Sequence, residues 1–123
     1  DHVIVPVRIE SYSYKGLKET IDSIFYIKSE HDLDKLNFAG TFITQANQAT
    51  NIFRQTAKAY KNELQGRFFD TSIRADTRVH ESETALIPLM SRKGNAVKDY
   101  AKLMTEIGIF GDFRSTEAFK EFI

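Results

Sequence analysis

The residues best suited to binding or catalysis follow Ile73, where an apolar run gives way to a charged segment that continues to Pro88. This segment begins with Arg74 and Asp76, and it carries the dipeptide His80-Glu81 further on. Loops that leave the carboxyl ends of strands hold the ligands of open α/β sheets. If the apolar run is a strand, this loop is therefore the expected binding site.

Two kinds of chemistry are open to these side chains. A histidine beside a glutamate could exchange protons with a substrate, but so short a motif is weakly specific. His80-Glu81 more readily forms the polar side of a short helix over residues 78–85. Arg74 and Arg78 could contact the phosphates of a nucleotide or of DNA, and so could the basic turn Arg92-Lys93. Solvated arginines are commoner than ligand-binding ones, so both interpretations stay open.

Several signatures of catalysis and cofactor binding are absent from the sequence. There is no phosphate loop of the form G-x-x-x-x-G-K-[ST] or G-x-G-x-x-G, and no G-x-S-x-G nucleophile elbow. The chain has no cysteine, and its three histidines (His2, His31 and His80) lack metal-ligand spacing. These 123 residues alone are therefore not expected to form a complete enzyme.

The elements that must position the loop alternate between strands and helices. Apolar runs predict strands at residues 3–7, 38–44 and 67–73. Each run is followed by apolar residues at helical spacing, which predict helices beginning near residues 14, 51 and 96. This alternation is typical of a parallel sheet with right-handed crossovers. We therefore predict a three-layer α/β/α fold with a small parallel sheet over residues 1–108, and a tail with a short helix at residues 109–123.

Local signals mark the ends of these elements. Pro6 cannot donate a ladder hydrogen bond, so the first strand should end near it. Small residues at Ala39-Gly40 suggest that another element packs closely on the second strand. Gly66 and Gly108 are expected to end helices in the left-handed conformation. Helix N-caps are expected at Ser11 or Ser13, at Asn47, Thr50 or Asn51, and at Ser115 or Thr116.

Composition excludes some classes of protein. Lys and Arg (17) balance Asp and Glu (17), so no overall charge attracts nucleic acid or membrane. The absence of cysteine fits a reducing cytosol. No apolar run approaches the roughly 18 residues of a membrane-spanning helix. The sequence begins with Asp1-His2 and runs directly into a buried-strand pattern, which leads us to expect that it is part of a longer protein.

The order of these segments resembles the ParA-type (MinD-like) partition ATPases, which are P-loop NTPases. DHVIVPVRIESYSYKGL resembles the family segment that follows its second acidic phosphate motif, with Asp1, Val5-Pro6, Glu10 and Gly16-Leu17 at matching places. FAGTFITQANQAT resembles the next strand and turn, and FFDTSIRADTRVHESETALIPL resembles the strand and loop near the nucleotide base. Arg78-Val79, Glu81 and Pro88 fit the pattern of that loop. RKGNAVKDYAKLMTEI resembles the closing helix, so the resemblance extends to about Gly108.

The resemblance implies a role for each part of the chain. In the family, the phosphate loop and the magnesium motifs precede this segment, so the chain corresponds to the C-terminal part of an ATPase that uses ATP and Mg²⁺. The chain alone should neither hydrolyse ATP nor bind these cofactors tightly. The expected contacts on the base side of the nucleotide are Thr44, Gln45, Ile73, Arg74 and Asp76. The possible DNA contacts are Arg78, Arg92 and Lys93.

Family membership would also imply partners and a cellular role. ParA-type ATPases form dimers around ATP, bind DNA nonspecifically and are stimulated by a ParB-like partition partner. They segregate plasmids or chromosomes in the bacterial cytoplasm, and relatives accompany conjugative elements. We also expect this chain to self-associate, because a parallel sheet that begins at such a strand presents an unpaired edge.

Two departures from the family pattern affect the loop. Arg74 stands where the family usually has proline, and Ser82-Glu83 stands where Ala-Pro is common. A different class of protein therefore remains an alternative: a non-catalytic α/β regulatory or protein-interaction module whose loop face binds another protein.

Overall fold

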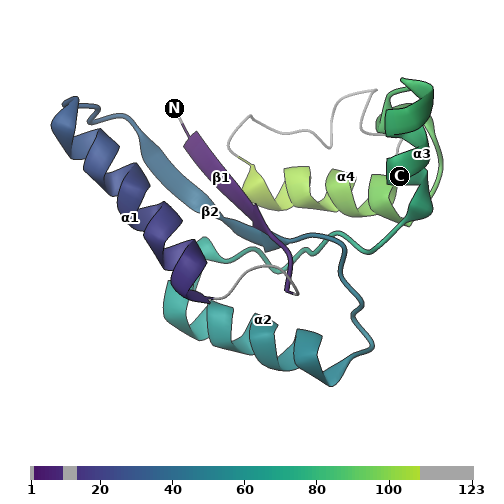
Figure 1. The fold of residues 1–123 in the computed structure, drawn as a ribbon, viewed down its shortest axis with the longest axis horizontal. Coiled ribbons are helices and arrows are strands. Elements are labelled where there is room, and N and C mark those ends of the chain that lie inside the picture. The colour runs from purple at the N-terminus through teal and green to yellow at the C-terminus, as the bar shows by residue number, and fades with distance from the viewer. Residues whose placement is uncertain (1, 10–13, 109–123) are drawn as a thin grey trace.

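The computed structural model describes residues 2–9 and 14–108, which form a mixed α/β fold (Figure 1). That part of the chain contains two strands, four α-helices and two 3-10 helices. The strands are β1 (His2–Val7) and β2 (Asn37–Ile43), and the α-helices are α1 (Tyr14–Glu30), α2 (Asn51–Leu64), α3 (Thr77–Ala85) and α4 (Asn95–Ile107). The 3-10 helices are η1 (Gln65–Arg67) and η2 (Leu89–Ser91). The predicted α/β class is confirmed.

β1 and β2 run parallel and form a two-stranded sheet. Val3 pairs with Phe38 whereas Ile4 pairs with Gly40, so Ala39 is an extra residue that makes a bulge in β2. The ring of Phe69 lies against Gly40, where an added Cβ would stand 2.7 Å from the ring atom Cε2. The close packing predicted at Ala39-Gly40 is therefore confirmed.

The third predicted strand, residues 67–73, is not formed as a regular strand. The segment runs parallel to β2, with an isolated bridge at each of its ends. Between the bridges, the amides of Asp70 and Thr71 donate to the Glu106 carboxylate of α4, at 2.6 and 2.8 Å. Phe69 and Ile73 donate to Thr41 and Ile43 of β2, but the Thr71 amide between them is bonded to Glu106. The segment is therefore extended without being a continuous strand.

Apolar side chains pack on both faces of the sheet. One core contains Val7, Leu17, Ile43, Ala46 and Tyr60, and it joins α1 and α2 to the strands. The other contains Phe42, Ile73, Ala96 and Leu103, and it joins α4 to them. The neighbours Phe42 and Ile43 thus belong to opposite cores, as strand geometry requires. Figure 1 shows α1 and α2 on one side of the strands and α4 on the other, so the described residues form three layers.

Pro6 lies inside β1, which ends one residue later at Val7. The amide of Thr44 donates to the carbonyl of Val7 at 2.8 Å, so Val7 directs its backbone polar groups toward the β2 side. Neighbouring residues of a strand direct these groups to opposite sides, so Pro6 faces the outer edge of β1. Pro6 has no amide hydrogen, but the hydrogen bonds between β1 and β2 do not require one at this position.

Helix ends follow the sequence signals with one exception. The hydroxyl of Thr50 caps α2 by accepting from the amide of Phe53 at 3.2 Å, and Gly108 (φ 63°) ends α4 in the left-handed conformation. The prediction for Gly66 is wrong. Because α2 stops at Leu64, the residue with positive φ is Gln65 (φ 52°), and Gly66 belongs to η1.

Some predictions fall outside the described residues. These are Asp1, the caps at Ser11 or Ser13, and the tail at residues 109–123 with its cap at Ser115 or Thr116. Among the helices that the structure describes, none combines the length and the apolar character needed to cross a bilayer.

Candidate functional site

A pocket of about 620 Å³ lies where the chain leaves the carboxyl ends of β1 and β2. Its apolar lining includes Pro6 and Phe42, and Tyr100 of α4 lines it as well. All five residues that were expected on the base side of a nucleotide also line this pocket: Thr44, Gln45, Ile73, Arg74 and Asp76. The structure therefore brings the five together around one space.

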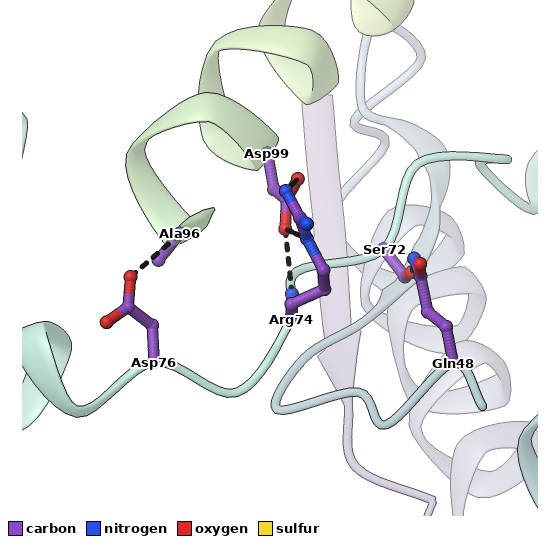
Figure 2. Close-up of polar contacts among 6 residues, drawn as sticks. All are labelled: Gln48, Ser72, Arg74, Asp76, Ala96 and Asp99. Atoms are coloured by element: carbon purple, nitrogen blue, oxygen red, sulfur yellow. Dashed lines mark hydrogen bonds and ion pairs between the residues drawn. The ribbon is translucent and has the colours of Figure 1, made fainter. Parts of the chain in front are cut away.

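Arg74 is held by Asp99 of α4 (Figure 2). Its Nε donates to Oδ2 at 2.8 Å and its Nη2 donates to Oδ1 at 2.9 Å, while its backbone amide donates to Oδ2 at 3.0 Å. The Asp99 side chain is 5% exposed. These hydrogen bonds raise the pKa of the Arg74 guanidinium above its ordinary value. The charge of Arg74 is thus neutralised within the fold, which leaves it poorly placed to bind a phosphate.

Asp76 connects the first turns of two helices. Its Oδ1 accepts from the amide of Arg78 at 3.0 Å and so caps α3. Its Oδ2 accepts from the amide of Ala96 in α4, also at 3.0 Å (Figure 2). The amides of Ala96 and Arg78 hold the pKa of the Asp76 carboxyl below its ordinary value of 3.8. Since the side chain is only 4% exposed, Asp76 shapes the wall of the pocket and presents little of its carboxylate to a ligand.

Thr44 and Gln45 form the turn after β2. The amide of Thr44 donates to the carbonyl of Val7 in β1. Two residues further on, the amide of Ala46 donates to the carbonyl of Ile73 at 2.9 Å. Gln45 lies between these two anchors with φ 51°, and it is exposed. A non-glycine residue in the left-handed region is strained by roughly 1–3 kcal/mol, and such residues cluster at binding sites.

Two residues beside the pocket were missed from the sequence. Asp99 follows Ala96 and precedes Leu103 at helical spacing, so its place on the apolar face of α4 was a visible signal of a buried carboxylate. Tyr100 of the same helix was not predicted as a site residue, and burial raises the pKa of its phenol. The hydrogen bond from Gln48 to Ser72 (2.8 Å, Figure 2) was also not foreseen, since neither residue type predicts the other.

His80 and Glu81 do not form a pair. His80 Nδ1 lies 4.0 Å from Glu83 Oε2, one helical turn along, with the two side chains 86% and 81% exposed. Glu81 instead accepts from Arg92 Nη1 at 3.3 Å. His80 and Glu83 both line the pocket, but the geometry does not support the acid–base interpretation of His80-Glu81.

The three possible DNA contacts gather at one corner, beside the N-termini of α3 and α4. An added Cβ on Gly94 would stand 2.9 Å from Cδ of Arg78, so the turn that carries Arg92 and Lys93 packs against Arg78. Arg78 lies 3.5 Å from Asp76 and Arg92 is bonded to Glu81, so carboxylates partly offset both guanidinium charges. Lys93 is exposed.

The described residues contain no group of three or more His, Asp or Glu side chains placed to hold a metal ion. Arg74 is the only arginine or lysine that lines the pocket in the described part of the chain, residues 2–9 and 14–108. Asp99 offsets its charge. The pocket therefore suits an uncharged, partly apolar group with hydrogen-bonding edges.

No protein-family model matches this chain, and no curated protein matches it.

Proposed function

We propose that this chain is the base-side part of a nucleotide-binding domain of the ParA type. The observation that carries the proposal is the pocket itself, which gathers Thr44, Gln45, Ile73, Arg74 and Asp76 at the carboxyl ends of the strands. Ligands of open α/β sheets bind at this position. The ordered resemblance of the sequence to ParA-type ATPases supports the same function. The P-loop NTPase identity of the fold is part of the proposal.

The charges around the pocket suggest which part of a nucleotide it receives. The guanidinium of Arg74 is already bonded to Asp99, and Glu83 adds a negative charge at the pocket. A triphosphate would meet no unpaired arginine or lysine among the residues that line it. An adenine base, in contrast, is uncharged and planar, and it could lie between the apolar lining and the polar turn at Thr44-Gln45. In the proposed parent ATPase, phosphates and Mg²⁺ are held by residues other than these 123.

A binding series on the 123-residue chain tests this proposal. Adenosine, AMP and ATP are titrated against ¹⁵N-labelled protein, and amide shifts are followed by NMR. Because the phosphates gain no partner in the pocket, we expect the three dissociation constants to agree within about threefold. Shifts should concentrate at residues 44–46 and 73–77. Absence of binding by all three ligands would refute the proposal, and so would ATP binding that is tenfold tighter than that of adenosine.

A pair of glutamine variants separates specific binding from general effects. Gln45→Ala removes an exposed carboxamide at the pocket and should weaken adenosine binding about fivefold, the loss of one ligand hydrogen bond. Gln55→Ala removes an exposed carboxamide from α2 and should leave the affinity unchanged. Equal affinities for the two variants would exclude Gln45 as a contact.

DNA binding, a property that the resemblance implies, is proposed for the corner formed by Arg78, Arg92 and Lys93. Lys93→Gln should weaken binding to duplexes of any sequence and lower the slope of log K against log salt by about 1. Arg92→Gln should have a smaller effect, because Glu81 already pairs with Arg92. Fluorescence anisotropy with a random duplex at several salt concentrations gives both slopes. An unchanged slope in Lys93→Gln would remove this corner from the proposal. Stimulation by a ParB-like partner belongs to the parent ATPase.

One observation favours the alternative of a protein-interaction module. Leu86 is 90% exposed, and Ile87 and Val79 are exposed nearby in sequence, on or just after α3. Exposed apolar residues that cluster can mark a protein contact. The encoded sequence before Asp1 discriminates between the two functions. A G-K-[ST] phosphate loop there supports the ATPase, whereas an unrelated domain supports the interaction module.

A further inference from the structure

Within residues 2–9 and 14–108, β1 pairs with one strand only. β2 occupies one of its edges, and the opposite edge has no partner strand in that part of the chain. Val3, Ile4 and Val5 are half-buried, although an interior strand would bury them completely. An edge of this kind is a template for another strand, because its amides and carbonyls point outward in a row.

The direction of Val7 determines which backbone groups the outer edge offers. Val7 faces the β2 side through its carbonyl, so Pro6 and Ile4 face outward by alternation. Ile4 offers both an amide and a carbonyl, whereas Pro6 offers a carbonyl alone. On the outer edge, Ile4 therefore supplies both a donor and an acceptor, whereas Pro6, two residues later, supplies only an acceptor.

We infer that two copies of this chain pair through the outer edges of β1, antiparallel, with Ile4 facing Ile4 of the second copy across a two-fold axis. In this register the two Ile4 residues exchange both of their backbone hydrogen bonds. Residue i of one copy faces residue 8 − i of the other, so Val3 lies opposite Val5. His2 lies opposite Pro6, and its amide meets the Pro6 carbonyl.

Three properties of the chain favour a second copy as the occupant. The edge complements itself. In the register in which the two Ile4 residues exchange both hydrogen bonds, the carbonyl of Pro6 also accepts from the amide of His2 in the second copy. Side chains on both faces of the strand are apolar, with Val5 directed to one core and Ile4 to the other, so the added strand should be apolar on both faces. β1 meets this condition. Finally, the net charge of zero means that two copies do not repel each other.

The donor that Pro6 lacks gives the first test, which uses the 123-residue chain. Pro6→Val supplies the missing amide, so the dimer gains two hydrogen bonds and its dissociation constant should fall about thirtyfold. Pro88→Val, at the only other proline and in an exposed position, restores an amide elsewhere and should leave the constant unchanged. Sedimentation equilibrium measures both. A chain that stays monomeric up to ~1 mM would overturn the inference. So would equal constants for the two variants.

The register gives the second test, which the absence of cysteine makes clean. Val3 and Val5 are opposed in a position without backbone hydrogen bonds, where Cβ atoms approach most closely. A mixture of Val3→Cys and Val5→Cys chains should form a disulfide-linked dimer under mild oxidation. Each variant alone should form several-fold less, because residue 3 then faces valine at position 5. Equal cross-linking in the mixture and in the separate variants would exclude this register.

Discussion

The Asp76→Asn variant tests whether one carboxylate organises the wall of the pocket. The aspartate accepts one amide from α3 and one from α4. The asparagine keeps the shape and one oxygen, so it can still cap α3. Its NH₂ group then faces the amide of Ala96, and this hydrogen bond is lost.

The expected loss of stability follows from these contacts. A hydrogen bond to a charged acceptor contributes about 1.5–3 kcal/mol. A negative charge near a helix N-terminus contributes about 0.3–1 kcal/mol, and Asp76 lies near two of them. Asp76→Asn should therefore lower the free energy of unfolding at pH 7 by about 3 kcal/mol. Urea unfolding followed by circular dichroism measures it. Asp22→Asn, on the exposed surface of α1, is the matched control and should change it by less than about 0.5 kcal/mol.

The pH dependence gives an independent check. The folded pKa of Asp76 lies below the ordinary value of 3.8. Its contribution is therefore fully present above that value and is lost as the pH falls through the folded pKa. The difference between wild type and Asp76→Asn should be constant above about pH 5 and should shrink below pH 4. A difference under 1 kcal/mol at pH 7, or one that persists unchanged at the lowest pH at which both proteins fold, would refute the reasoning.

Three further substitutions can be assessed by the same urea measurement. Gly94→Ala should destabilise the fold by about 2 kcal/mol, because the new Cβ would stand 2.9 Å from Asp76 Oδ2, which Ala96 holds in place. An unchanged midpoint would show that the carboxylate can move. Leu86→Gly should stabilise it by about 0.5–1 kcal/mol, since Leu86 has φ 57° and loses no burial at 90% exposure. A loss of stability would show that the leucine side chain packs in solution. Thr41→Val should stabilise it by about 1 kcal/mol, because the fully buried hydroxyl of Thr41 has no hydrogen-bond partner among the described residues. A lower midpoint would reveal a partner for that hydroxyl.

Local signals were enough to predict most elements of the fold. Helical spacing located α1, α2 and α4, and continuous apolar runs located β1 and β2. The third strand was predicted from the same kind of run. Its amides at Asp70 and Thr71 bond instead to Glu106, which lies 35 or 36 residues further along the chain. No local pattern contains that contact.

The site shows the same division. Parallel strands end at one edge of a sheet, so the gathering of Thr44, Gln45 and Ile73 could be predicted from strand order alone. The ion pair of Arg74 could not be predicted in this way, because its partner Asp99 lies 25 residues further along the chain. The pattern of charges left two interpretations of Arg74 open, a phosphate contact or a solvated arginine. In the structure, the buried carboxylate of Asp99 on the apolar face of α4 binds the guanidinium of Arg74 and offsets its charge.

The contacts of α4 with residues 70–76 also set how this part of the protein opens. Asp76 bonds to Ala96 in the first turn of the helix, and Arg74 bonds to Asp99 further along it. The amides of Asp70 and Thr71 bond to Glu106 in the last turn. A helix held at both ends and in between does not fray turn by turn. The amides of α4 and of residues 70–74 should therefore exchange with deuterium in one cooperative step, with a common protection factor.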